Sequence, residues 1–471
     1  MRLPMEMAPK PFLVAKRASV SDAKLAYFEG DFERCLEICA DIRVRTLATA
    51  SEVALLTARA YLCTGRAHEA QKTIVETLET HATLDASLTA QMLVATARIR
   101  QDDADTGIAM LVDAAARSAG AHFAIRSEIA FSTALGHWAK REIETAETYL
   151  ALVNPRSDII HARALDLQAW CHTARRDYRR SAEYFRLTLL RLDECQASDR
   201  AIAARAISTL AIFAAELFDR DIARFVETRA QNLVWSSGLS IQRYLTLAHL
   251  ALFHEFTGDT VEAYQFATQA RESAPTVPFE VLGWGLSSAI ARNAGEGYSA
   301  IVFAQRARQL LDTLDVRELT GEERFSMLSV AENCAHFDPD KAAGLFAGYW
   351  GLAPVDKMLA LSGDPRLTAD ETFIAGVIAQ AGGELDRAQL CYRKAFDLFK
   401  DIGYVRRAVT SAHAILNLAD DDDLRRYILA QLAGTTNYVT KSLAGEPLTS
   451  SPRARVSPSP RRYNEWNSSS S

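Results

Sequence analysis

Two short stretches carry residue types that could bind a metal ion or a phosphate group. His249, His254 and Glu255 lie close together, but a zinc peptidase needs two histidines four residues apart with the glutamate between them. Residues 293–297 hold two glycines but lack the Lys-Ser/Thr pair and the preceding strand of a phosphate loop. We therefore expect His254 to be structural and residues 293–297 to form an ordinary turn.

Four aspartates at 420–423 and seven scattered cysteines are the other candidates. A calcium loop needs spaced oxygen ligands and a glycine turn, whereas a run of Asp is common at helix starts. The cysteines form no C-x-x-C pair, and we expect them to be small buried helix residues in a reducing compartment. The sequence contains no G-x-S-x-G nucleophile elbow, no set of protein-kinase motifs and no Rossmann dinucleotide-binding fingerprint. These patterns predict no enzyme, no metal and no cofactor.

Composition favours a helical protein without a membrane segment. The chain has 471 residues, of which 49% are hydrophobic and 24% charged, with few Gly and Pro. This length predicts either several domains or a solenoid. A net charge of −6 gives no basic field for nucleic acid. The N-terminus lacks the apolar run of a signal peptide, and no stretch approaches the ~20 apolar residues of a membrane helix, so we expect a cytoplasmic protein.

The elements that must position any functional residue are helical hairpins, and residues 371–407 show the clearest one. Apolar residues recur there at helical spacing in two segments, on either side of a turn at Gly382 and Gly383. Small residues, Gly376 and Ala388, stand where the two helices would touch. One hairpin cannot bury its outer face, so it needs copies stacked on either side.

The same pair of small residues, twelve positions apart, recurs along the chain. Turn residues stand five positions before the second member in the better copies, as at Gly30, Gly65 and Gly258, with Arg176 as a variant. Successive units start 35 to 45 residues apart, by differences such as 58 − 23 = 35 and 376 − 331 = 45. The ten pairs are Ala23/Cys35, Ala58/Ala70, Ala95/Gly107, Ala134/Ala146, Ala169/Ser181, Ala211/Ala223, Ala251/Ala263, Ser288/Ala300, Ala331/Ala343 and Gly376/Ala388.

This pattern resembles the tetratricopeptide repeat (TPR), with its strongest matches at A-Y-F-E-G-D-F-E-R-C-L-E from Ala26 and H-E-F-T-G-D-T-V-E-A-Y from His254. The resemblance implies an all-α fold, a right-handed superhelical solenoid of TPR-like helix-turn-helix hairpins. We expect an N-terminal segment at 1–15, an array of about ten hairpins at 16–403, a capping helix pair at 404–435 and a disordered Ser/Pro/Arg tail at 436–471.

A TPR-like solenoid implies a concave groove lined by the first helix of each hairpin, where a partner segment can lie. Counting the first small residue as the eighth position of the repeat, the second, fifth, ninth and twelfth positions should face this groove. Trp and Arg at these positions are candidates to anchor a partner segment. The alternative for each position is that the residue is an ordinary solvated charge or an aromatic that packs between repeats. The candidates are Arg17, Lys24, Arg59, Glu128, Trp138, Arg163, Asp166, Trp170, Glu255 and Asp370.

The tail carries a second resemblance. Read in a shifted codon frame, Tyr463 to Asn467 and the flanking residues are compatible with I-[AS]-P-A-L-Q-R-M-E-L-V-V. This looks like the opening of the LuxR-type helix-turn-helix domain, which follows long TPR-like arrays in bacterial transcription regulators. Nothing in residues 436–471 as written forms the two helices that enter a major groove. DNA would therefore be contacted only through a helix-turn-helix domain that this chain lacks.

The sequence thus predicts a non-enzymatic array that binds a protein, a peptide segment or a small effector. The main hypothesis makes it the regulatory part of a bacterial LuxR-type regulator; the alternative is a stand-alone TPR adaptor that binds peptide segments in its groove. An enzyme built on an α-solenoid is least favoured, because no paired carboxylates stand out. Membrane partners are not expected, and oligomerisation stays open.

Overall fold

The structure, a computed structural model, describes residues 18–44, 46–78, 83–156, 158–194, 199–233, 235, 239–319, 321–351, 365–433, 435 and 437–444. Within these residues the regular secondary structure is helical and contains no strand, so the fold is an all-α solenoid of TPR-like hairpins, as the sequence predicted. The chain divides into two compact units, which we call unit 1 (1–206 with 236–238) and unit 2 (207–235 with 239–471) and describe separately.

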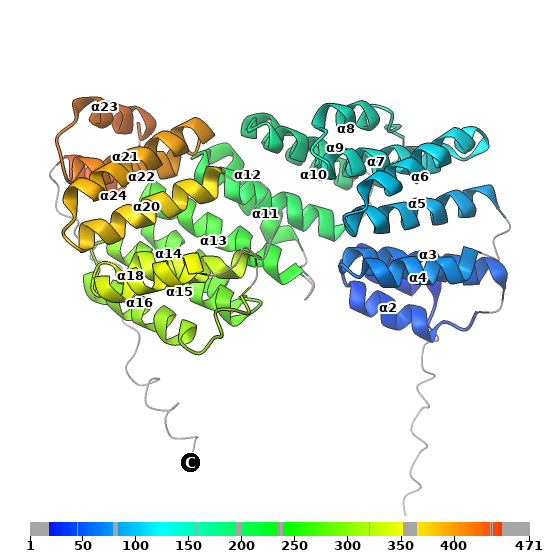
Figure 1. The fold of residues 1–471 in the computed structure, drawn as a ribbon, viewed down its shortest axis with the longest axis horizontal. Helices are drawn as coiled ribbons and strands as arrows, with labels where there is room; N and C mark the ends of the chain where they lie inside the picture. The colour runs from blue at the N-terminus through cyan, green and yellow to red at the C-terminus, as the bar shows by residue number, and fades with distance from the viewer. Residues whose placement is uncertain are drawn as a thin grey trace, which may run out of the picture. The chain divides into compact units, whose positions relative to one another are not determined.

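Unit 1 is a stack of hairpins in which successive helices pack side by side (Figure 1). A single turn of 3₁₀ helix, η1 (Ser118–Gly120), follows one of the second helices. The helices are α1 (Val20–Phe28), α2 (Phe32–Asp41), α3 (Leu47–Cys63), α4 (Ala67–Leu78), α5 (Leu84–Arg100), α6 (Ala104–Arg117), α7 (Phe123–Ala139), α8 (Ile143–Leu150), α9 (Asp158–Ala174), α10 (Tyr178–Glu194) and the first part of α11 (Arg200–Glu216).

Unit 2 begins within α11 and continues the same alternation of first and second helices. Its helices are α12 (Arg220–Asn232), α13 (Ser240–Thr257), α14 (Thr260–Glu272), α15 (Val277–Asn293), α16 (Gly297–Leu311), η3 (Gly321–Arg324), α17 (Phe325–Cys334), α18 (Pro339–Gly351), α20 (Pro365–Ala381), α21 (Leu385–Ile402), α22 (Val405–Leu416), α23 (Asp422–Gln431) and α24 (Tyr438–Leu443).

The small residues lie where the helices of each hairpin meet. In nine of the ten predicted pairs both members are buried, because a larger side chain would push the helices apart. At Gly107 an added Cβ would lie 2.7 Å from the Ala95 carbonyl oxygen, and at Gly376 it would lie 2.7 Å from the Tyr392 ring. The spacing of twelve thus reflects close helix contact within a hairpin.

The turn of these nine hairpins is a Schellman motif. The residue five positions before the second small residue has positive φ in every one of them: Gly30, Gly65, Asp102, Arg141, Arg176, Phe218, Gly258, Gly295 and Gly383. The next residue donates its backbone N–H to the carbonyl five residues back, as from Asp31 to Ala26 (3.0 Å) and from Glu384 to Ala379 (2.8 Å). Non-glycine residues adopt this conformation at Asp102, Arg141 and Phe218, which is why the sequence did not reveal those turns.

The pair Ala331/Ala343 is wrong by one residue. Ala343 is exposed, whereas Ala342 is completely buried, so the spacing there is 342 − 331 = 11. The turn between α17 and α18 is shorter: the Asp338 N–H donates to the carbonyl of Cys334 (2.8 Å), and Ala335 stays in the right-handed helical region. Without a left-handed turn residue, the register of the second helix moves by one.

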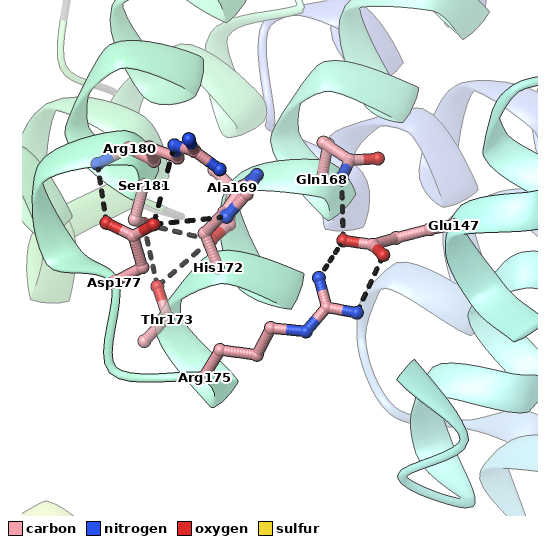
Figure 2. A network of polar contacts seen from close by, with 9 residues as sticks. All are labelled: Glu147, Gln168, Ala169, His172, Thr173, Arg175, Asp177, Arg180 and Ser181. Atoms are coloured by element: carbon pink, nitrogen blue, oxygen red, sulfur yellow. Dashed lines mark hydrogen bonds and ion pairs between the residues drawn. The ribbon is translucent and has the colours of Figure 1, made fainter. Parts of the chain in front are cut away.

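Polar side chains replace part of the small-residue contact in the hairpin of α9 and α10 (Figure 2). Ser181 donates through Oγ to the carbonyl of Ala169 (2.9 Å) and lies 2.7 Å from Thr173 Oγ1. From the same end of α9, the Arg175 guanidinium makes two bonds to the carboxylate of Glu147 on α8 (2.5 and 2.8 Å). These contacts fix α9 against both its partner helix and the preceding hairpin.

The C-terminal helices partly differ from expectation. The helix pair expected after the last hairpin is present as α22 and α23, and the Asp421 carboxylate caps α23 by accepting from the backbone N–H groups of Asp423 and Leu424. The sequence placed residues 436–471 in a disordered tail, but α24 is a helix within that range, begun by the cap of Asn437 on Thr440 N–H (3.0 Å). Residues 445–471 and the N-terminal segment 1–15 lie outside the described residues.

Candidate functional site

Ionisable side chains from four of the helices converge within unit 1. The Arg59 guanidinium pairs with the Glu128 carboxylate. Arg163 Nη2 lies 2.9 Å from Asp199 Oδ2, and Arg205 Nη2 lies 2.5 Å from Asp166 Oδ2. We define the unit 1 charge cluster as Arg59 of α3, Glu128 of α7, Arg163 and Asp166 of α9, Asp199 just before α11, and Arg205 of α11.

The repeat register explains why these residues meet. Glu128, Arg163 and Arg205 each stand six residues before the first small residue of their hairpin, at the second position of the repeat. Asp166 and Arg59 stand at the fifth and ninth positions, which share a helix face with the second. Stacking of the hairpins therefore brings equivalent faces of the first helices together.

Burial and charge pairing oppose each other in this cluster. Burial raises the pKa of Glu128, but the Arg59 charge and hydrogen bond outweigh burial and hold that pKa below its usual value. Burial also raises the pKa of Asp166, and there Arg205 offsets only part of the effect. The Asp166 side chain is 5% exposed and its Oδ1 has no hydrogen-bond partner among the described residues, while the Arg205 side chain is 45% exposed.

Unit 2 holds a second convergence of charges. Arg406 Nη2 lies 2.5 Å from Glu216 Oε1, and Arg407 Nη2 lies 3.0 Å from Asp370 Oδ1. Asn293 Nδ2 donates to Glu255 Oε1 at 2.6 Å. We define the unit 2 charge cluster as Glu216 of α11, Glu255 of α13, Arg292 of α15, Asp370 of α20, and Arg406 and Arg407 of α22.

The pair at the centre of this second cluster is more deeply buried. The side chains of Glu216 and Arg406 are 9% and 8% exposed. Burial raises the pKa of Glu216, but Arg406 and Arg407 outweigh it and hold that pKa low. Burial raises the pKa of Glu255, whose partners compensate less. Glu216 Oε2 and Arg406 Nε have no hydrogen-bond partner among the described residues, which therefore do not fully satisfy this pair.

The structure places nine of the ten candidates of the sequence analysis, in four settings. Arg59, Glu128, Arg163 and Asp166 belong to the unit 1 charge cluster, and Glu255 and Asp370 to the unit 2 charge cluster. Lys24 is exposed, with Nζ 2.5 Å from Glu52 Oε1. Trp138 and Trp170 pack against the hydrophobic core around Ala134, and the Trp170 ring meets Phe185 edge to face. Arg17 lies outside the described residues. All ten remain candidates for partner binding.

Sequence reasoning did not select several cluster members. Arg205 and Arg292 stand at the second and twelfth positions of their repeats, so a complete count of the register would have found them. Glu216 lies one residue beyond the twelfth position, and Arg406 lies on α22, which has no small-residue pair. For these two no sequence signal exists, because their pairing joins residues 190 positions apart.

The stretches considered for metal or phosphate binding have structural roles. His254 Nε2 lies 2.7 Å from Glu227 Oε1, and its ring stacks on Phe266 at 5.4 Å. Across the described ranges, no group of three or more His, Cys, Asp and Glu side chains is placed to hold a metal ion. None of the helices in the described part of the chain is long and apolar enough to cross a membrane.

In comparisons with known proteins, no family model and no curated protein matches this chain. Among solved structures it is similar to the human IFIT1 dimer with PPP-AAAA (14% identity, 90% of this chain and 100% of that chain, TM-score 0.36). It is also similar to the APC/C hetero-tetramer Cut9-Hcn1, with 11% identity over 90% of this chain and 90% of that chain and a TM-score of 0.25. A third similar structure is Naa15/Naa10 bound to HypK-THB, with 12% identity over 88% of this chain and 78% of that chain and a TM-score of 0.18. Likenesses at these TM-scores carry no argument about function.

Proposed function

We propose that this protein is a non-enzymatic, cytoplasmic helical-repeat adaptor that binds a segment of another protein over the unit 1 charge cluster. The observation that carries this proposal is the pair of Asp166 and Arg205. The Asp166 carboxylate is buried, with one oxygen that has no hydrogen-bond partner among the described residues, while the Arg205 side chain is 45% exposed. The exposed guanidinium offers a fork of donors to a carboxylate or carbonyl group of an incoming segment.

The composition of the cluster bears on the kind of partner. Three arginines stand against two aspartates and a glutamate, so the cluster has no net charge when all are ionised. A surface of alternating sign selects by position rather than by total charge, since complementary charges favour one register and like charges penalise others. This arrangement supports a peptide segment of mixed charge better than a uniformly acidic or basic one.

The test is selection of peptides from a random displayed library against the intact protein, followed by affinity measurement with labelled peptides. Arg205→Glu reverses the exposed charge beside Asp166, and we expect it to weaken the selected peptides at least about tenfold, the effect of losing ~1.4 kcal/mol. The matched control is Arg180→Glu on the second helix α10, whose side chain is 69% exposed and which should change affinity less than about twofold. Equal affinities for both variants would reject this site.

A narrower hypothesis is that the array is the sensing part of a LuxR-type transcription regulator. Its support is the shifted-frame reading of residues 463–467, which lie outside the described residues. The nucleotide sequence from codon 440 to a few hundred bases beyond codon 471 tests it directly. A shifted frame that continues into a full helix-turn-helix supports the regulator, whereas two frames that close within a few codons leave only the adaptor.

A further inference from the structure

The outer face of α10 is rich in arginine. Residues 175–191 contain six Arg against one Asp and one Glu, a balance of 6 − 2 = +4, whereas the whole chain has a net charge of −6. Arg179, Arg180 and Arg186 are exposed on this helix. Arg179 and Arg186 are seven residues apart, so they fall on one line along the helix surface. This face therefore carries a local positive charge on a protein that is negative as a whole.

Two leucines continue the same face. The side chains of Leu187 and Leu190 are 46% and 44% exposed, and Leu190 lies four residues after Arg186 on the same line. The opposite face of α10 already packs against α9, because Phe185 and Leu189 are buried and the Phe185 ring meets Trp170 edge to face at 5.5 Å. The hairpin thus does not need the two exposed leucines for its own packing.

The segment after α8 adds a third apolar side chain. Arg191, one turn after Leu187, donates from Nη2 to the carbonyl oxygen of Pro155 (2.7 Å), so this segment lies against the same side of α10. Leu152, three residues before Pro155, is 65% exposed. We define the α10 patch as Arg179, Arg186, Leu187 and Leu190 of α10 together with Leu152.

Nearby acidic groups neutralise only part of this charge. Asp177 accepts from the backbone N–H of Arg180 and lies 3.6 Å from its guanidinium, at the start of α10 (Figure 2). Glu147 of α8 binds Arg175 through both oxygens. Between residues 179 and 190 the sequence contains one acid, Glu183. The α10 patch therefore presents arginines and leucines side by side.

We propose that the α10 patch binds an acidic segment of a partner protein that carries apolar side chains at helical spacing. Arginine pairs well with carboxylates, and covering the exposed leucines removes apolar surface from water. The leucines favour a protein segment over a nucleic acid, while the positive charge selects acidic segments over basic ones. This inference rests on the proposed adaptor function and assigns a second binding surface to it.

The experiment uses the displayed library already described. The most acidic peptides enriched by the intact protein are labelled with fluorescein, and their affinity is measured by fluorescence anisotropy. Arg179→Glu reverses one charge of the patch, and Leu187→Ser/Leu190→Ser removes its apolar contacts without changing the charge. We expect each variant to bind these peptides at least about tenfold more weakly than the wild type.

Matched controls come from exposed positions on other second helices. Arg224→Glu on α12 reverses the charge of a side chain that is 77% exposed, and Leu390→Ser on α21 removes a leucine that is 70% exposed. Both should change the affinity of the acidic peptides by less than about twofold, since single exposed side chains outside a binding site contribute little. Circular dichroism of each variant checks that the helices are intact.

Three results would overturn the proposal. The first is no enrichment of acidic peptides over the unselected library, and the second is wild-type affinity in either Arg179→Glu or Leu187→Ser/Leu190→Ser. A loss confined to Arg179→Glu would show only general attraction between opposite charges. The third is a labelled oligouridylate that binds as tightly as the acidic peptides and is released by Arg179→Glu, which would assign the patch to nucleic acid.

The same variants separate this inference from the adaptor function at the unit 1 charge cluster. Peptides that depend on Arg205 are measured on Arg179→Glu, and the acidic peptides are measured on Arg205→Glu. Peptides that depend on Arg205, without any that depend on Arg179, reject only the α10 patch. The reverse result rejects only the site at the unit 1 charge cluster.

Discussion

The Asp166–Arg205 pair of the unit 1 charge cluster and the Glu216–Arg406 pair of the unit 2 charge cluster differ in how much water reaches the arginine. In unit 1 the guanidinium of Arg205 is 45% exposed beside a buried carboxylate, whereas in unit 2 the equivalent partner, Arg406, is 8% exposed. Similar side chains on similar helices thus experience different dielectric surroundings.

This difference decides what each cluster contributes. A solvent-accessible ion pair adds little to stability because water competes for both charges. A desolvated pair contributes little net free energy when intact, but removing one partner is costly because a charge is left buried. The exposed Arg205 guanidinium is therefore suited to contact a ligand, while the Glu216–Arg406 pair must keep its charges paired or covered.

The largest expected effect is the loss of Arg406. Arg406→Met leaves the Glu216 carboxylate buried without its partner and should destabilise unit 2 by about 3–5 kcal/mol. Arg205→Met in unit 1 should cost less, since burial already raises the pKa of Asp166 and its carboxyl is protonated more readily than that of Glu216, whose pKa is held low. Urea unfolding followed by circular dichroism, with hydrogen exchange to identify the unit that opens, measures both. The double variant Glu216→Gln/Arg406→Met should recover much of the loss, and equal costs for Arg406→Met and Arg205→Met would remove the proposed distinction.

A smaller effect is expected where hairpin helices touch. Gly107→Ala in unit 1 places a methyl group 2.7 Å from a backbone carbonyl, and we expect a cost of about 1–3 kcal/mol. Gly376→Ala in unit 2 meets the Tyr392 side chain rather than a backbone atom, so its cost should be lower. Gly344→Ala in α18 is the control, because no atom lies within 4 Å and the helix should gain about 0.5–1 kcal/mol. Thermal unfolding ranks the three, and a cost for Gly376→Ala above that of Gly107→Ala would contradict the argument.

Turn residues should give effects of opposite sign in the two units. Arg141 in unit 1 has φ 63°, so Arg141→Gly relieves a left-handed conformation and should stabilise by up to about 1 kcal/mol. Phe218 in unit 2 has φ 57°, but its ring packs on Phe253 and Phe256 at 5.9 and 5.1 Å. Phe218→Gly should therefore destabilise despite the relief of strain. Denaturation midpoints of both variants test this, and a gain for Phe218→Gly would show that the ring contacts contribute little.

The smallest expected effect is a pH dependence that arises from His413 in unit 2. Burial lowers the pKa of His413, which contacts Ser442 of α24. The unfolded chain therefore binds the proton more readily than the folded one, and stability is lost as pH falls below about 6.5 towards the lowered pKa. Urea midpoints at pH 7.5 and 5.5 should drop less in His413→Gln than in the wild type. An identical drop in both would assign the acid sensitivity to other groups.

The small-residue spacing predicted most hairpins because it reports a local steric requirement. The Schellman turn at Gly30 and the close helix contact at Gly376 are both set by residues within one hairpin, so the sequence contains all the information that they need. The prediction was wrong by one residue at Ala343, where the turn is shorter and no glycine marks it. It also missed α24, because six residues show too little periodicity for a helix to be inferred.

The sequence by itself determined the all-α class and most of the hairpins, since these follow from side-chain size and spacing along a few turns. Only the tertiary structure decided which charges meet. Arg59 and Glu128 are 69 residues apart, and Glu216 and Arg406 are 190 apart. Their pairing depends on how many hairpins lie between them and how each one stacks. Burial of Arg406 and exposure of Arg205 follow from the same stacking, because the cover over a side chain is supplied by distant residues.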